Sequence, residues 1–174
     1  MNALLDPLVY LECLKIVAER DNLAQSELHP IMINEVLAVE DELGIPLPEQ
    51  YEDFLMKAGA GTEYGGLATW YHFDLTLTGN LLEKNVEIQH RRRGEKPPGD
   101  FLAVYDPCDG SLIGYQAQNG SYSTELFIWS KEDGIESLSD DLYSFLAENI
   151  DCDGAELEEA ERRALPSATG TVIN

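Results

Sequence analysis

The sequence contains few of the residues that build disulfide frameworks and metal centres. Its 174 residues include only three cysteines and three histidines, namely Cys13, Cys108, Cys152, His29, His72 and His90. The cysteines are odd in number, widely separated and without a CxxC pair, which indicates a reduced, cytoplasmic protein. The histidines lack the spacing of metal ligands, so we expect neither a metal nor a cofactor.

Basic residues are also scarce. Eleven lysines and arginines stand against 33 aspartates and glutamates, which gives a net charge of -22 and a pI of about 4.2. Such a field repels nucleic-acid phosphates and anionic lipid, and it attracts cationic partners over roughly 8 Å in physiological salt. We therefore expect no direct nucleic-acid or membrane binding. The basic segment HRRRGEK, from His90 to Lys96, is interpreted as a solvated loop.

Long hydrophobic runs and catalytic motifs are missing as well. The N-terminal segment MNALLDPLVYLECLK has no basic residue before Lys15, and Asp6 and Pro7 interrupt it, so we expect no signal peptide and no membrane span. The sequence has no GxSxG motif, P-loop or GxGxxG unit, and Ala155 interrupts the calcium-like start DCDG. We expect a protein that is not an enzyme and has no catalytic residue, while an enzyme of unfamiliar type stays an open alternative.

Helical signals dominate the first third of the chain. Asp6 and Pro7 form an N-cap and first-turn pair, and apolar residues then recur at helical spacing up to Arg20. The stretch IMINEVLAVEDELG predicts a second helix that ends at Gly44. A third helix starts at Pro48 and ends in the glycine-containing run AGAG. The sequence thus predicts three consecutive helices.

The hydrophobic period then changes from helical to alternating. The segment TWYHFDLTLT, residues 69–78, predicts a half-buried strand with Trp70, His72 and Asp74 on one face. A helical segment, NLLEKNVEIQ, separates it from three further predicted strands, FLAVYD, SLIGYQAQ and TELFIWS. The short connections between these three predict antiparallel pairing.

The order of these elements predicts an α+β fold. A last helix, with an N-cap at Ser139, continues to Ile150 and closes the domain. We expect N-terminal helices, an antiparallel sheet of about four to six strands and this closing C-terminal helix. Residues 1–30 are expected to form a helical extension packed on the domain, residues 31–150 the domain itself, and residues 151–174 an acidic helix and a polar tail.

The corner between the second and third predicted helices carries a recognisable pattern. An acidic helix ends at LG, LP starts the next helix, an aromatic residue and FL follow, and a glycine turn ends it. The residues are Glu40, Leu43, Gly44, Leu47, Pro48, Tyr51, Phe54, Leu55, Gly59 and Gly61. This pattern resembles the signature of the SUKH superfamily. The segments GDFLAVYD, DGSLIGY and LYSFLAENI are similar to its strand pair and closing helix, so the resemblance covers roughly residues 31–150.

The resemblance implies a binding module. Bacterial members of the superfamily act as immunity proteins that neutralise polymorphic toxins, often nucleases, and fungal relatives act in cell-wall signalling. It therefore implies a bacterial, cytoplasmic protein that binds and occludes a basic protein toxin. A scaffold or regulatory module of the same fold, acting through a cellular partner or as a homodimer, is the alternative.

Aromatic and acidic residues in or beside the predicted strands are the candidates for the partner-binding face. Aromatic side chains supply much of the binding energy of an interface, and charges supply steering and specificity. The candidates are Glu63, Tyr64, Trp70, Asp74, Asp106, Asp109, Glu125, Trp129, Glu132 and Asp133.

Overall fold

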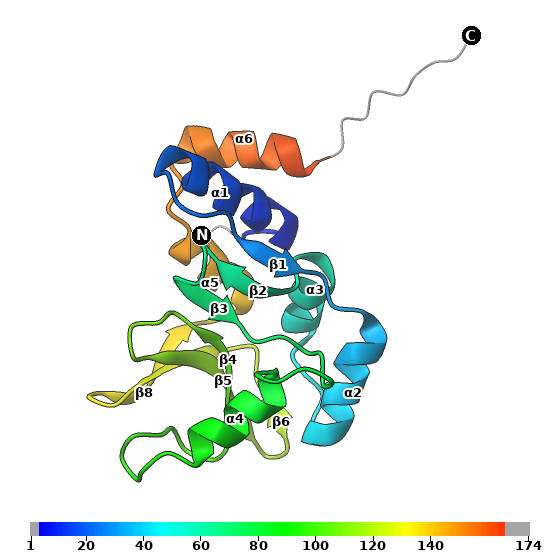
Figure 1. Cartoon of the computed structure of the whole chain (residues 1–174), viewed down its shortest axis with the longest axis vertical. Helices are drawn as coiled ribbons and strands as arrows, with labels where there is room; N and C mark the ends of the chain where they lie inside the picture. The colour runs from blue at the N-terminus through cyan, green and yellow to red at the C-terminus, as the bar shows by residue number, and fades with distance from the viewer. Residues whose placement is uncertain (1–3, 166–174) are drawn as a thin grey trace.

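The computed structural model describes residues 4–165 (Figure 1). Its helices are α1 (Pro7–Arg20), α2 (Ile33–Leu43), α3 (Glu49–Lys57), α4 (Leu81–Gln89), α5 (Leu142–Asn149) and α6 (Gly154–Ala164). Its strands are β1 (Glu27–His29), β2 (Ala60–Glu63), β3 (Ala68–Trp70), β4 (Phe101–Asp106), β5 (Leu112–Gln118), β6 (Ser121–Tyr122), β7 (Leu126–Ser130) and β8 (Gly134–Ser139). The expected acidic helix is α6, and the polar tail after it lies outside the described residues.

One antiparallel sheet runs through the molecule. Its strand order is β1-β2-β3-β4-β5-β7-β8, and β6 pairs with β5 beside this path. The predicted α+β class and the closing helix are therefore confirmed. The sheet has eight strands, more than expected, because β1, β2, β6 and β8 were not predicted from the sequence.

The predicted helix ends are formed by the expected local interactions. The Asp6 side chain accepts a hydrogen bond from the Leu8 backbone N–H at 2.8 Å and so caps α1. Gly44 ends α2 in the left-handed conformation, with φ of 70°. Pro48 then occupies the N-cap position of α3. These signals are local in sequence, which is why the pattern alone could place the three helices.

Helices α1, α3 and α5 pack against one another and around an aromatic cluster of the sheet. The Trp70 ring lies 4.5 Å from that of Phe54 on α3 and 4.4 Å from that of Tyr105 on β4, between centroids. Phe145 on α5 meets the same tryptophan edge-on. Figure 1 shows α1 and α6 side by side at one end of the molecule and α4 at the opposite end.

The predicted strand over residues 69–78 is wrong beyond Trp70. The chain leaves the sheet there, and Trp70, Tyr71 and Phe73 are all buried, so the predicted two faces do not exist. Asn85 of α4 explains the early end: its side chain donates to the Ala103 carbonyl at 2.9 Å and accepts from the Ala103 N–H at 2.8 Å. This side chain takes the place that a longer β3 would occupy beside β4.

The start of the closing helix also differs from the prediction. Ser139 is the last residue of β8, and the N-cap of α5 is Asp141, whose side chain accepts from the Ser144 N–H at 2.8 Å. The stretch after the Asp133–Gly134 turn is therefore a strand that pairs with β7 before the helix begins.

Two glycines of the AGAG run allow β1 and β2 to pair closely. Gly59 and Gly61 have φ values of 94° and 143°, which side chains rarely permit. A Cβ on Gly61 would lie 1.9 Å from the Glu27 carbonyl oxygen, and one on Gly59 would lie 1.8 Å from that of His29. The run therefore serves strand pairing as well as helix termination.

Among residues 4–165, no helix has the length and the apolar character that a membrane crossing requires.

Candidate protein-binding site

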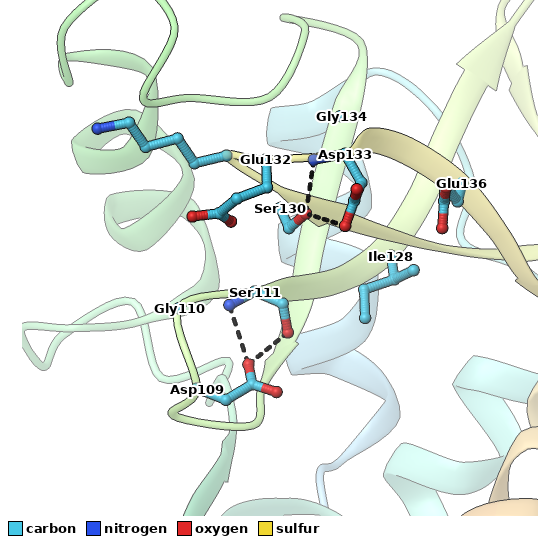
Figure 2. Close-up of a pocket in the computed structure, with 10 residues that line it drawn as sticks. Asp109, Gly110, Ser111, Ile128, Ser130, Glu132, Asp133, Gly134 and Glu136 are labelled. Atoms are coloured by element: carbon cyan, nitrogen blue, oxygen red, sulfur yellow. Dashed lines mark hydrogen bonds between the residues drawn. The ribbon is translucent and has the colours of Figure 1, made fainter.

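An open groove of about 480 Å³ lies where the loop before β5 meets the β7–β8 hairpin. Figure 2 shows its lining residues, with Asp109 and Ser111 on one side and Ser130, Glu132 and Asp133 on the other. The lining comprises Asp109, Gly110, Ser111, Ile128, Ser130, Lys131, Glu132, Asp133, Gly134 and Glu136. We call this feature the acidic groove.

The loop before β5 holds Asp109 in place. Its Oδ1 accepts hydrogen bonds from the Ser111 backbone N–H at 2.9 Å and from the Ser111 hydroxyl at 2.5 Å (Figure 2). These bonds favour the ionised form and keep the pKa of Asp109 below its ordinary value. Ser111 is itself buried at the start of the strand, so one wall of the groove carries a fixed anion.

The β7–β8 hairpin forms the other wall. Ser130 pairs with Gly134, which turns the chain with φ of 73°, and the Asp133 N–H donates to the Ser130 hydroxyl at 3.1 Å. Glu132 and Asp133 lie exposed in this turn. Glu136, also exposed, follows on β8 opposite Ile128. A tight turn and one strand thus place three carboxylates beside Asp109.

The groove is strongly anionic. Its one basic residue, Lys131, directs its ammonium to Glu95 outside the groove, at 3.1 Å. Among the described residues, no group of three or more histidine, cysteine, aspartate or glutamate side chains could hold a metal ion. Because the carboxylates do not converge on a point, the arrangement suits several cationic side chains spread along the groove.

The structure brings Asp109, Glu132 and Asp133 together, but not the other four surface candidates. Asp74 caps a turn by accepting from the Thr76 N–H at 3.0 Å, and Asp106 accepts from the Cys108 N–H at 2.8 Å. Glu125 accepts a hydrogen bond from the Ser137 hydroxyl across β7 and β8. Tyr64 is half-buried, with φ of 49° at the turn after β2. Each of these residues has a local structural role.

Glu63, Trp70 and Trp129 lie in the core and not on a partner-binding surface, which corrects the expectation for these three candidates. Their exposed fractions are 3%, 1% and 6%. Strand alternation does not reveal this, because α1, α3 and α5 cover the face on which Trp70 and its neighbours lie.

Glu63 is a buried carboxylate that three different elements supply with donors. Its oxygens accept hydrogen bonds from the hydroxyl of Tyr10, from the Trp70 indole N–H at 2.8 Å and from the Tyr105 hydroxyl at 3.1 Å. Burial raises the pKa of Glu63, and the three hydrogen bonds oppose that rise. This residue organises the core and has no access to a partner.

Glu136 is the acidic residue of the groove that is not among the candidates predicted from the sequence. It lies on β8, a strand that was not predicted from the sequence. The signal that could have found it is the Asp-Gly turn at residues 133–134 after a predicted strand, because such a turn usually leads into an antiparallel partner strand.

Comparison with known proteins agrees with this fold. A family model described as SMI1-KNR4 cell-wall matches residues 33–146, which run from the start of α2 into α5. No curated protein sequence matches the chain. The family match covers well over half of the 174 residues and includes the corner of the second and third helices and most of the sheet. The chain therefore belongs to the SUKH superfamily.

Proposed function

We propose that this protein is an immunity protein that neutralises a basic toxin by binding it through the acidic groove. The superfamily is known for toxin immunity and for cell-wall regulation, it is generally non-enzymatic, and it implies protein–protein interaction. The observation that carries the proposal is the meeting of Asp109, Glu132, Asp133 and Glu136 in one groove of a chain with net charge -22.

The mechanism is blockade without turnover. A toxin that cleaves nucleic acid needs a cationic surface to hold the phosphate backbone. Fixed carboxylates in the groove imitate those phosphates and occupy the same lysines and arginines. Association is fast because the fields of the two proteins attract, and it slows as salt screens that attraction. We place this binding in the bacterial cytoplasm, in keeping with the free cysteines Cys13, Cys108 and Cys152.

Co-expression with the neighbouring reading frame tests the proposal directly. A large secreted protein encoded beside this chain should be toxic alone, and growth should recover when this chain is present. The two proteins should co-purify, and the association rate should fall as salt rises. Binding that does not weaken at all in salt would exclude charge mimicry.

Paired charge reversals test the groove itself. Asp133→Lys with Glu136→Lys should abolish the rescue of growth. Glu19→Lys with Glu158→Lys makes the same change in net charge at exposed positions on α1 and α6, and it should leave rescue intact. If both double variants lose rescue to the same degree, the acidic groove is not the binding site.

A scaffold or regulatory role is the second candidate, favoured by the cell-wall description of the matching family. In this role the same surface would bind a cellular partner, or the chain would form a homodimer. A dimer face built on Trp70 and Trp129 is incompatible with their burial. Light scattering distinguishes the candidates, because a stable homodimer would favour the second.

A further inference from the structure

The faces of α2 and α3 that meet at their junction expose apolar side chains beside two carboxylates. Ile33, Leu37 and Glu40 follow one another at four- and three-residue spacing, so they share one face of α2. Ile33 and Leu37 are 51% and 56% exposed, which is unusual for large aliphatic side chains on the same helical face. On the neighbouring side of the helix, Val36 and Val39 are fully buried.

Helix α3 continues this surface. Glu52 and Met56 are one turn apart, and the Glu52 carboxyl lies close to that of Glu40. The Ile31 N–H donates to the Leu55 carbonyl at 2.8 Å, which brings Met32 beside the end of α3. We call this surface, formed by Met32, Ile33, Leu37, Glu40, Glu52 and Met56, the α2–α3 face.

The two carboxylates on this face have no counter-charge among the described residues. Glu40 accepts one backbone hydrogen bond, from the Leu47 N–H at 2.8 Å, and neither it nor Glu52 forms an ion pair there. The pKa of Glu52 is raised to about 7. Burial is the largest cause, and the neighbouring carboxylates of Glu40 and Glu49 add to it. The nearby lysine, Lys57, pairs with Asp53 at 3.1 Å instead. A cation placed between the two glutamates would relieve this repulsion.

We propose that the α2–α3 face binds an amphipathic segment of a partner protein, with a lysine or arginine between Glu40 and Glu52 and apolar residues over Ile33, Leu37 and Met56. Charge decides the occupant. A second copy of this chain would bring the same carboxylates and another net charge of -22 against the face, whereas a basic amphipathic helix complements both its apolar and its acidic parts. The face shares no residue with the acidic groove, so this proposal does not depend on toxin neutralisation.

The methionines provide a selective measurement. The chain has three, Met1, Met32 and Met56, and two of them belong to the α2–α3 face. The full chain labelled with ¹³C at its methionine methyl groups is titrated with a leucine–lysine amphipathic peptide of about 14 residues, roughly four helical turns. We expect saturable shifts of the Met32 and Met56 signals.

Two matched leucine variants distinguish peptide binding at the α2–α3 face from unspecific electrostatic binding to an acidic protein. Leu37→Ser should weaken peptide binding about tenfold, the effect of losing one buried leucine contact. Leu67→Ser removes a leucine of similar exposure, 58% against 56%, from the turn between β2 and β3 and should have no effect. Equal effects of the two variants would overturn the proposal.

Two further comparisons test the charge and the location. Glu52→Gln should weaken binding of the leucine–lysine peptide, and a leucine–glutamate peptide should not bind. The double variant Asp133→Lys with Glu136→Lys should leave the methionine shifts unchanged. If that variant abolishes the shifts, or if the peptide binds without moving Met32 or Met56, the α2–α3 face is not the docking site. If the chain fails to rescue growth from the toxin, the outcome of this peptide titration is not affected.

Discussion

Glu63 is a charged side chain that folding places in the interior. It lies on β2, and its hydrogen-bond donors come from α1, β3 and β4. Strand β3 follows β2 after a turn, whereas α1 and β4 are distant from β2 in the sequence. A buried carboxylate is tolerated only when its lone pairs are satisfied, and here Tyr10, Trp70 and Tyr105 satisfy them. The residue therefore couples the packing of three aromatic side chains.

Replacement of Glu63 should lower stability strongly. Glu63→Ala leaves three buried donors without an acceptor and removes packed atoms, so the free energy of unfolding should fall by about 3–5 kcal/mol. Glu63→Gln keeps one acceptor oxygen and should lose less. Urea unfolding followed by tryptophan fluorescence measures both, since Trp70 is one of the partners. An unchanged urea midpoint for Glu63→Ala would show that the hydrogen-bond cluster contributes little.

At the scale of elements, the α2–α3 junction should make stability depend on pH. The pKa of Glu52 is raised to about 7 in the folded protein by burial and by Glu40 and Glu49, against about 4.3 in an unfolded chain. The folded state thus binds more protons between these values, and the stability that Glu52 contributes is full below about pH 4.3 and is lost as pH rises through 7.

Glu52→Gln isolates this effect, because glutamine does not titrate. Between pH 5 and pH 8 the wild-type protein should lose stability relative to Glu52→Gln, as measured by urea unfolding at both pH values. Parallel pH profiles of the two proteins would contradict the assignment. The comparison cancels the contributions of titrating groups that do not interact with Glu52, Glu63 included.

The pairing of β1 with β2 should depend on a glycine at position 61. Gly61→Ala would place a Cβ 1.9 Å from the Glu27 carbonyl oxygen, whereas Gly66, also at positive φ, has open space around it. We expect Gly66→Ala to cost about 1–2 kcal/mol from backbone strain alone and Gly61→Ala about 3 kcal/mol or more. If urea unfolding shows the same loss of stability for Gly61→Ala and Gly66→Ala, β1 moves away from the new side chain without an energetic cost.

The elements that sequence could predict are those with local signals. Caps at Asp6 and Gly44 and the proline at 48 act within one helical turn, so α1, α2 and α3 were predictable. Strands β1, β2 and β6 have three, four and two residues, too few for a period, and they exist because a distant partner pairs with them. The end of β3 at Trp70 depends on Asn85, whose contact with Ala103 joins residues 18 positions apart in the sequence.

At the scale of the whole molecule, net charge should oppose folding. With 33 acidic against 11 basic side chains, carboxylates outnumber cations three to one, and their mutual repulsion is greatest in the compact state. Salt screens this repulsion, so the thermal midpoint should rise by several degrees from low to moderate sodium chloride. If screening is the cause, choline chloride should raise the thermal midpoint as much as sodium chloride at the same concentration. A midpoint that stays constant or falls with salt would show that the protein's own ion pairs matter more.

The candidate site was only partly predictable for a related reason. Acidic character is a property of the whole chain, and turn signals placed Asp109, Glu132 and Asp133 at the ends of predicted strands. Their assembly into one groove requires β5 to pair with β7 and the β7–β8 hairpin to form. The burial of Trp129 and Glu63 depends equally on packing between distant segments, which alternation along one strand does not report.

The hydrogen bond that the Tyr10 hydroxyl donates to Glu63 bears on the design of shorter fragments of this protein. Residues 33–146 mark where sequence similarity to the family extends, yet Tyr10 lies upstream of that range. A fragment cut at those limits would remove a donor from the centre of the core and uncover Phe54, which contacts the Tyr10 ring on the missing helix. The range covered by the family match therefore leaves out a part of the hydrophobic core.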